Sequence, residues 1–286
     1  MATTKLSERA RTGFAKGLLY DQHRPSYPAN AVTKLLDSAG VRGVRDARMV
    51  DLASGTGKFT ELLAAREEAF DILAVEPHAG MRSGLERKHL PRVDSRDGSS
   101  TAIPAADGTI DAVFAAQAFH WFANQESLRE IHRVLKPGGV LGMIWNIEDY
   151  NQTKSATMTT TWESKLHDLT WTFDDNEPRF RHEKWKQVFD NQIKSTPLTI
   201  LTSANPLFSL PLGEVEVKFT TWLSKESLWS RYSTLSQIAV LEGEELENTK
   251  RTFTEIVNGD DVETNEKGEI PVHGVTFMAW TSKIPE

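Results

Sequence analysis

A short apolar run that leads directly into a glycine-containing loop most limits what this chain can fold into. Residues 49–57 read Met-Val-Asp-Leu-Ala-Ser-Gly-Thr-Gly, and a helical pattern with Leu62 and Leu63 on its inner side begins at about Lys58. Glycine permits a tight turn and lets a ligand approach the backbone closely. The start of the following helix offers N–H groups without helical partners. This strand–loop–helix unit predicts a ligand site at the carboxyl end of a buried parallel strand.

Apolar strands recur along the chain and alternate with helical patterns. The expected strands are residues 49–53, 72–75, 92–96, 110–116, 140–145, 215–221 and 270–282. Near-continuous apolar strands that alternate with helices are typical of a parallel sheet covered on both faces. We therefore predict an α/β fold with a doubly wound, Rossmann-like sheet of seven strands and a helical cap inserted after the fifth strand.

The chain of 286 residues is expected to form a single domain with four parts. These are an N-terminal lid (1–28), a cofactor-binding core (29–146), a cap or substrate insertion (147–212) and C-terminal strands and helices (213–286).

Charge and composition exclude several classes of protein. Asp and Glu total 40 against 33 Lys and Arg, and the net charge of −7 argues against nucleic acid or an anionic membrane as a partner. The first 30 residues contain no apolar core of signal-peptide length. The chain has no cysteine, and its histidines show no metal-ligand spacing. We expect a cytoplasmic protein without a metal, a monomer or weak dimer, that acts on a small molecule.

Glu76 follows the second predicted strand, roughly 20 residues beyond the loop, where a carboxylate can accept both hydroxyls of a ribose. Loop and carboxylate together indicate an adenosine-containing ligand. A nicotinamide dinucleotide fits poorly, because the loop lacks the third small residue and Asp51 would lie near a pyrophosphate. The same Asp51 suits S-adenosylmethionine, which carries an ammonium and a sulfonium and has no phosphate.

Several ordered stretches resemble the motifs of class I S-adenosylmethionine-dependent methyltransferases. They are residues 50–58, 74–77 with Met81, 97–104, 107–113 and 135–139. With residues 20–28 and 117–122, the set resembles the type 11 group that contains trans-aconitate methyltransferases and gliotoxin bis-thiomethyltransferases. One residue departs from the motif, because Ala53 stands where the family has its first glycine. Its methyl group allows close backbone contact only at negative φ, and we expect tolerance rather than loss of binding.

The resemblance implies which residues contact the cofactor. Tyr20 and Arg24 would close over its methionine end. Asp51 and the carbonyls near Ala53 and Gln117 would face its ammonium. Glu76 would hold the ribose, Met81 would pack on the adenine, and Asp97 and Ser99 would meet the polar edge of the adenine. The full predicted set is Tyr20, Arg24, Asp51, Ala53, Ser54, Gly55, Gly57, Glu76, Pro77, Met81, Asp97, Gly98, Ser99 and Gln117.

On the side of the methyl acceptor, His120 is the natural general-base candidate because it follows the fourth strand at its ligand-facing end. Trp121 and Trp145 are expected to wall an apolar acceptor pocket, with the aromatic body of such residues supplying most of the contact. Trp162 in the cap and His23 in the lid complete the predicted acceptor set.

Methyl transfer from a sulfonium needs orientation more than covalent help from the protein. The resemblance, the absence of cysteine and the lack of an arginine cluster together favour S-methylation of the dithiol of a reduced epidithiodiketopiperazine such as gliotoxin. Such an enzyme would serve toxin self-protection in secondary metabolism and release S-adenosylhomocysteine. One alternative is O-methylation of a carboxylic acid or another metabolite. Another is a non-catalytic regulatory protein that binds S-adenosylmethionine on the same fold.

Overall fold

The computed structural model describes residues 25–173, 177–193 and 206–285. The predicted lid residues Tyr20, His23 and Arg24 lie outside this part of the chain. The chain is divided into two compact units, which we call the loop unit and the helical unit. Of the described residues, the loop unit comprises 26–145, 178–193, 206–216 and 277–285, and the helical unit comprises 25, 146–173, 177 and 217–276. The segment predicted as a cap, 147–212, is therefore shared between the two units.

The predicted seven-stranded Rossmann-like sheet is confirmed, with the strand order β3-β2-β1-β4-β5-β7-β6. The strands are β1 (Arg48–Leu52), β2 (Asp71–Val75), β3 (Val93–Arg96), β4 (Ile110–Ala116), β5 (Leu135–Glu148), β6 (Gly213–Leu223) and β7 (Ile270–Ser282). Strand β1 pairs in parallel with both β2 and β4, so the order of strands reverses beside it. Such a reversal at the carboxyl ends of parallel strands is where ligands bind in open α/β sheets.

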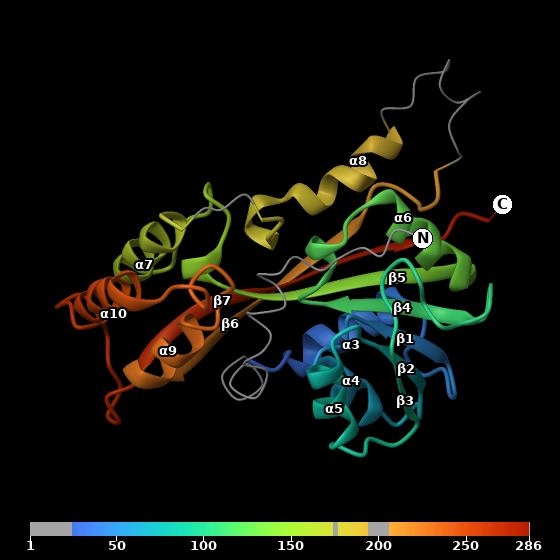
Figure 1. Cartoon of the computed structure of the whole chain (residues 1–286), viewed down its shortest axis with the longest axis horizontal. Helices are drawn as coiled ribbons and strands as arrows, with labels where there is room; N and C mark the ends of the chain where they lie inside the picture. Colours follow the sequence, from blue (N-terminus) through green and yellow to red (C-terminus); the bar gives the residue numbers. More distant parts are fainter. Residues whose placement is uncertain (1–24, 174–176, 194–205, 286) are drawn as a thin grey trace. The chain divides into compact units, whose positions relative to one another are not determined.

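Short helices connect the strands of the loop unit, and Figure 1 shows three of them, α3, α4 and α5, beside β1, β2 and β3. The helices of this unit are α3 (Ala29–Ser38), α4 (Lys58–Ala64), α5 (Ala79–Glu86), α6 (Gln125–Val134) and α8 (Gln187–Ile193), with 3-10 turns η1 (Phe119–Trp121), η3 (Phe180–His182) and η4 (Lys184–Lys186). Sequence dictates these helices locally. In α6 the side chain of Asn124 caps the first turn by accepting from Ser127 N, and Leu128 and Ile131 are fully buried.

The start of the fifth strand differs from the sequence prediction, which placed this strand at 140–145. The helix stops at Val134, and β5 begins at once with Leu135 paired to Ile110. The register then shifts, so that Ala112 pairs with Val140. The Pro-Gly-Gly stretch at 137–139 is an irregularity within the long strand rather than a turn before it, because a bulge accepts residues that a regular ladder excludes.

The helical unit contains η2 (Asp149–Asn151), α7 (Thr161–Trp171), α9 (Lys225–Tyr232) and α10 (Gly243–Val257). Helices α7 and α10 pack side by side (Figure 1). Their shared core is aromatic and aliphatic, and its largest buried side chains are Tyr150, Trp162, Leu166, Tyr232 and Phe253. No helix in the described ranges is long and apolar enough to cross a lipid bilayer.

Candidate functional site

The carboxylate of Asp51, near the end of β1, has no exposed surface. Its Oδ2 atom accepts a hydrogen bond of 2.6 Å from the Thr60 hydroxyl, whereas Oδ1 has no hydrogen-bond partner among the described residues. Burial raises the pKa of Asp51 to about 7, and the negative charge of Glu76 adds to that rise, whereas the Thr60 bond opposes it. A buried acceptor without a donor is costly. Asp51 is therefore suited to a ligand that brings a positively charged N–H donor.

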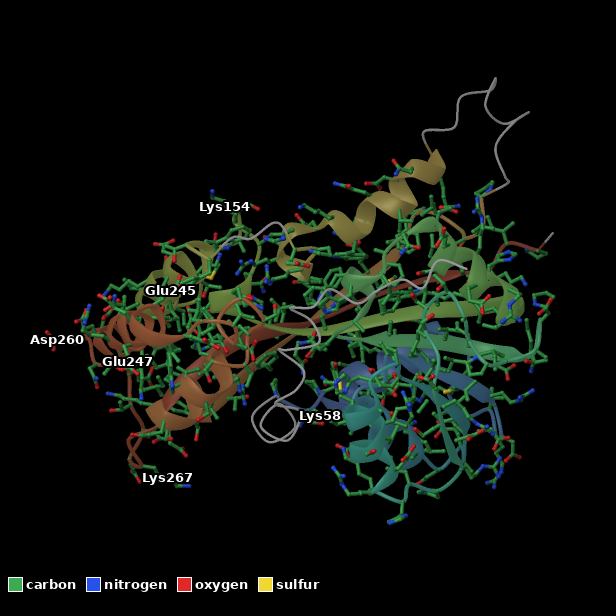
Figure 2. All side chains as sticks on the ribbon, in the orientation of Figure 1. Lys58, Lys154, Glu245, Glu247, Asp260 and Lys267 are labelled. Carbon is green, nitrogen blue, oxygen red and sulfur yellow. The ribbon has the colours of Figure 1, made fainter. Side chains whose placement is uncertain are left out.

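The loop after β1 takes a path that glycine makes possible. Gly55 and Gly57 have φ values of 58° and 83°. A Cβ atom on Gly57 would overlap the Leu85 side chain of α5. The loop closes on itself because Gly57 N donates to Ser54 O at 2.9 Å. Helix α4 then begins at Lys58, which is labelled in Figure 2.

Ala53 does not have the negative φ on which its tolerance was predicted to depend. Its φ is 59°, in the left-handed region that favours glycine. The same conformation occurs at Gln117, directly after β4, where φ is 55° and the N–H donates to Ile144 O at 2.8 Å. A left-handed residue with a side chain costs roughly 1–2 kcal/mol. Both central strands therefore end in a strained backbone position, which is a common property of functional sites.

Glu76, directly after β2, is only 5% exposed and joins the loop to the next segment. Its Oε2 accepts from Gly55 N at 3.0 Å, and its Oε1 accepts from His78 N at 2.8 Å. Burial raises the pKa of Glu76, and these two backbone bonds oppose that rise. Each carboxylate oxygen can accept a second hydrogen bond. The orientation of the carboxylate is thus fixed while acceptor capacity for ligand hydroxyls remains.

Arg82 on α5 connects the ends of β2 and β3. Its Nη1 donates to the Glu76 carbonyl at 2.7 Å and to Asp97 Oδ1 at 2.8 Å. The Asp97 side chain is 75% exposed, so the predicted adenine contact would be made by a carboxylate that Arg82 already holds. Met81 is buried, and its sulfur lies 3.8 Å from the position that a Cβ of Gly55 would occupy. The predicted ribose and adenine residues are therefore neighbours in the folded chain.

Gly98 and Ser99 form the turn after β3. A Cβ atom on Gly98 would come within 2.8 Å of Val75 Cγ1 and 3.0 Å of the Ala102 carbonyl. Ser99 N donates to that same carbonyl at 3.2 Å. Pro77, in contrast, is exposed.

His120 and Trp145 are in direct contact. The indole Nε1–H of Trp145 donates to His120 Nδ1 over 3.0 Å. Trp145 itself is fully buried and packs on Trp185, with ring centroids 4.9 Å apart. Trp121 is partly exposed, and its ring centroid lies 5.0 Å from that of His120. Trp145 therefore lies in the aromatic core of the loop unit and holds His120, rather than presenting an open wall.

Trp162 lies in the other unit from the residues above. It is fully buried in the core of the helical unit, near the start of α7. Its assignment to the acceptor pocket stays a prediction, as do the assignments of Tyr20, His23 and Arg24, which lie outside the described residues.

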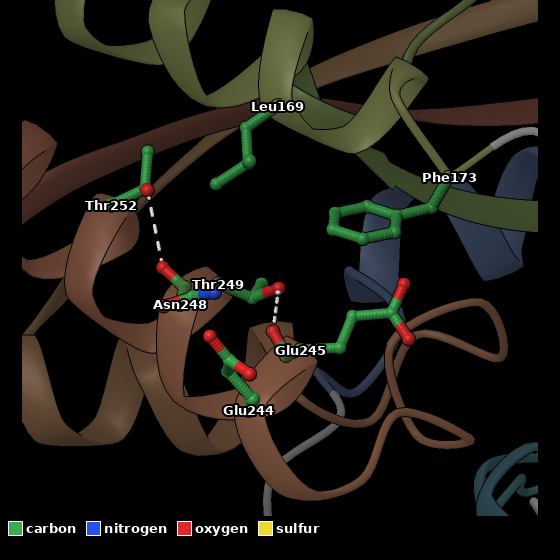
Figure 3. A pocket seen from close by; sticks show the side chains of 7 residues that line it. All are labelled: Leu169, Phe173, Glu244, Glu245, Asn248, Thr249 and Thr252. Carbon is green, nitrogen blue, oxygen red and sulfur yellow. Dashed lines mark hydrogen bonds between the residues drawn. The ribbon is translucent and has the colours of Figure 1, made fainter.

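The helical unit also has an open groove of about 540 Å³ between α7 and α10. Leu169 and Phe173 line one side, and α10 residues including Glu245 and Thr249 line the other (Figure 3). Glu245 is exposed, and Thr249 Oγ1 donates to the Glu245 carbonyl within the helix. The groove has the size of a small-molecule site, but the side chains that line it include no imidazole. Across the described ranges, no group of histidine, aspartate and glutamate could hold a metal ion.

Sequence reasoning missed the roles of Thr60, Arg82 and Trp145. Thr60 lies in the first turn of α4. A hydroxyl at this position of the sequence is a signal that could have predicted its hydrogen bond to the carboxylate of Asp51. Arg82 directly follows Met81, within a stretch already assigned to the ligand. The contact of Trp145 with His120 has no local signal, because it joins the η1 turn to a residue of β5 that lies 25 positions further along the chain.

The comparisons with known proteins agree with this geometry. The family described as "Methyltransferase domain" matches residues 50–143. An uncharacterized methyltransferase of Schizosaccharomyces pombe is 31% identical over 258 residues, which cover 86% of this chain and 90% of that protein. A methyltransferase-like protein of the same organism is 37% identical over 170 residues, and the match spans 59% of this chain but only 62% of that relative. The solved structure of the YcgJ protein of Bacillus subtilis shares the fold, with a TM-score of 0.53 at 14% identity over 88% of this chain and 98% of that one.

We predict that Asp51→Asn stabilises the protein at alkaline pH. The folded-state pKa of about 7 lies above the ordinary value of 3.8, so the folded protein binds the proton more tightly than the unfolded chain. Stability contributed by this group is present below about pH 4 and is lost as pH rises to about 7. The loss is on the order of 4 kcal/mol, and asparagine avoids it while still accepting from Thr60.

Urea unfolding of wild type and Asp51→Asn across this pH range measures the difference. Asp97→Asn, which removes an exposed carboxylate, is the control for loss of one charge. A pH dependence in Asp51→Asn equal to that of wild type would contradict the prediction.

Ala53→Gly should raise the free energy of unfolding by about 1 kcal/mol, because glycine adopts positive φ without the steric cost of a Cβ. Ala69 has φ of 53° at a site outside the loop, so Ala69→Gly should give a similar gain and serves as the positive control. Ala65 has φ of −79°, and Ala65→Gly should give no gain. Chemical denaturation compares the three variants, and a loss of stability in Ala53→Gly alone would show that its methyl group makes a packing contact that outweighs the strain.

Proposed function

Because the chain belongs to the class I S-adenosylmethionine-dependent methyltransferases, we propose that Asp51 and Glu76 bind the amino-acid end and the ribose of that cofactor and that the protein methylates a small molecule. The observation that carries the proposal is the buried Oδ1 of Asp51, which lacks a hydrogen-bond donor among the described residues. The ammonium of the cofactor supplies such a donor together with a positive charge. A phosphate at this position would meet a buried carboxylate instead.

The residues around Asp51 fit the rest of the cofactor. Glu76 is held by two backbone N–H groups with its remaining lone pairs available for the two ribose hydroxyls. Met81 offers an apolar, polarizable surface beside the loop for the adenine. We assign the polar edge of the adenine to the segment of Asp97, Gly98 and Ser99, and the carboxyl end of β4 at Gln117 to the methionine part.

When bound, the cofactor supplies a methyl group activated by a sulfonium. The protein contributes orientation and the exclusion of water, which can lower the barrier by roughly 7–11 kcal/mol when the reacting atoms are well aligned. The partly exposed ring of Trp121 lies beside His120, so the proposed acceptor end of the site is apolar apart from that imidazole. Such a lining favours a compact acceptor with apolar rings.

We propose the thiols of a reduced epidithiodiketopiperazine, such as gliotoxin, as the acceptor. A protein that handles reactive disulfides and dithiols benefits from having no thiols of its own, and this chain has no cysteine. The finer assignment rests on this composition and on the resemblance of the sequence to that group of enzymes.

The acceptor is tested by incubation of the protein with S-adenosylmethionine labelled at the methyl group and either reduced gliotoxin or trans-aconitate. We expect label in the bis-thioether and none in the acid. Transfer to trans-aconitate alone would replace the thiol assignment with carboxylate O-methylation. Transfer to neither, with intact cofactor binding, would remove both acceptors.

We predict that the affinity for S-adenosylhomocysteine, which retains the ammonium, falls as pH drops below about 7. Asp51 must lose its proton to pair with the ammonium, so each pH unit below its pKa of about 7 weakens binding by up to about tenfold. Titration calorimetry of wild type across this range measures the slope.

Two variants test the residues separately. Asp51→Asn should bind weakly at every pH and lose the slope. Glu76→Gln should lose about 1–3 kcal/mol of binding free energy, because one acceptor becomes a donor, and should keep the slope. Unchanged affinity in Glu76→Gln would refute the ribose assignment, and a flat wild-type profile would refute the role of Asp51.

A further inference from the structure

The chain between β3 and β4 carries the predicted adenine contacts on an irregular backbone. The described residues of this connection, 97–109, include no helix, and they begin with Asp97, Gly98 and Ser99. An irregular segment loses conformational entropy when a ligand orders it, and that loss weakens binding. The segment therefore binds a ligand more tightly if other parts of the protein already hold it in place.

Helix α6 supplies contacts that hold this segment. Glu130 Oε1 accepts from the N–H of Ile103 at 2.7 Å, and Arg133 Nη2 donates to the carbonyl of the same residue at 3.1 Å. Arg133 Nη1 also donates to the Ala105 carbonyl at 2.9 Å. Ile103 is only 3% exposed, so both of its backbone polar groups are bound inside the protein by side chains of α6.

Glu130 and Arg133 are joined to each other, and we call them the α6 pair. Arg133 donates to Glu130 from Nε to Oε2 at 2.8 Å and from Nη2 to Oε1 at 2.7 Å. Burial favours a higher pKa for Glu130, but Arg133 and the Ile103 N–H bring the pKa below its ordinary value. Two hydrogen bonds between a planar guanidinium and a carboxylate fix the orientation of both groups. The α6 pair is therefore a rigid support for the backbone of Ile103.

The support extends from Ile103 to the predicted adenine turn. The preceding residue, Ala102, exchanges two backbone hydrogen bonds with Ser99, at 3.1 Å and 3.2 Å. A second contact from α6 reaches the same turn, because the buried Ser127 hydroxyl donates to the Ser100 hydroxyl at 2.9 Å. The conformation of the turn therefore depends on side chains of α6.

We propose that Glu130 and Arg133 are positioning residues for the cofactor, which hold the segment after β3 in the shape that recognises the polar edge of adenine. The proposal rests on the cofactor function proposed above and adds the source of its nucleobase specificity. Adenine presents a hydrogen-bond donor at N6 and an acceptor at N1, whereas hypoxanthine presents an acceptor and a donor at these positions. A fixed segment rejects hypoxanthine because polar groups would be left unpaired, and a loose segment adapts to both bases.

Titration calorimetry with S-adenosylhomocysteine and S-inosylhomocysteine measures this specificity. The wild type should bind the adenine compound at least about tenfold more tightly. Arg133→Lys keeps the positive charge but lacks the planar fork that reaches Glu130 and the Ile103 carbonyl together. It should bind S-adenosylhomocysteine about tenfold more weakly and lose most of the preference for adenine. Glu130→Gln keeps an oxygen for the Ile103 N–H, so it should show a smaller loss of both.

Arg66 and Glu68 form a matched control pair. Arg66 donates to Glu68 from Nε at 3.1 Å and from Nη2 at 2.8 Å, and Glu68 Oε1 accepts from the N–H of Gly43 at 3.1 Å. This pair contacts the residues that precede β1 and β2, at the edge of the sheet opposite the loop. Arg66→Lys should also lower the free energy of unfolding, but it should leave the affinity for both compounds and the preference for adenine unchanged.

Hydrogen exchange tests the ordering of the segment in the full-length protein without a ligand. Mass spectrometry should find faster amide exchange across residues 98–105 in Arg133→Lys than in the wild type, and wild-type exchange there in Arg66→Lys. The exchange rates show whether a change in specificity comes from a loosened segment.

An unchanged preference for adenine in folded Arg133→Lys would overturn the proposal, and so would equal wild-type affinity for the two compounds. If Arg133→Lys does not fold, the same measurements on Glu130→Gln decide the matter. A wild type that binds neither compound would refute the proposed cofactor and this proposal with it. Wild-type binding that none of the α6 variants alters would refute the positioning role alone.

Discussion

The carboxylate of Asp51 is completely buried where the first strand of the sheet ends, and the surrounding residues are arranged about that charge. Thr60 satisfies one oxygen at 2.6 Å, and no described residue donates to the other. Burial moves the pKa of Asp51 to about 7, so the protein without a ligand holds a group that is costly to ionise. A cationic ligand removes that cost, whereas a phosphate increases it. The constraint that destabilises the fold without a ligand is therefore also the basis of the proposed ammonium contact.

Other buried carboxylates in the chain show that burial alone does not mark a ligand site. Glu163 on α7 has no exposed surface, yet it accepts from the Thr160 hydroxyl and from both N and Nδ1 of His273. Glu148 lies 3.7 Å from an Arg231 nitrogen, so its charge is compensated although neither of its oxygens accepts a hydrogen bond. Asp51 differs from both, because among the described residues it has a hydroxyl partner, no cationic partner and a negative neighbour in Glu76. The missing positive charge is the feature on which the proposed contact of Asp51 with a cationic ligand rests.

The sheet and the loop could be predicted because their signals are local. A strand buried on both faces reads as an apolar run, and the last strand, 270–282, was predicted with its observed bounds. The boundary between α6 and β5 could not be predicted, since Pro137, Gly138 and Gly139 signal a turn unless the register of the neighbouring strand is known. The conformation of Ala53 was equally hidden, because its φ is imposed by the loop and not by alanine. The division of residues 147–212 between two units depends on long-range packing that no periodicity encodes.

The two central strands, β1 and β4, are followed by residues with the same backbone conformation. Strand β1 ends and the chain turns at Ala53, and strand β4 ends and the chain turns at Gln117, both with positive φ. The pairing of Ala116 with Ile144 brings the turn after β4 beside the end of β5. From there the short η1 segment carries His120 onto the indole N–H of Trp145. The turn that costs conformational energy at Gln117 is thus the one after which an imidazole meets the buried indole N–H.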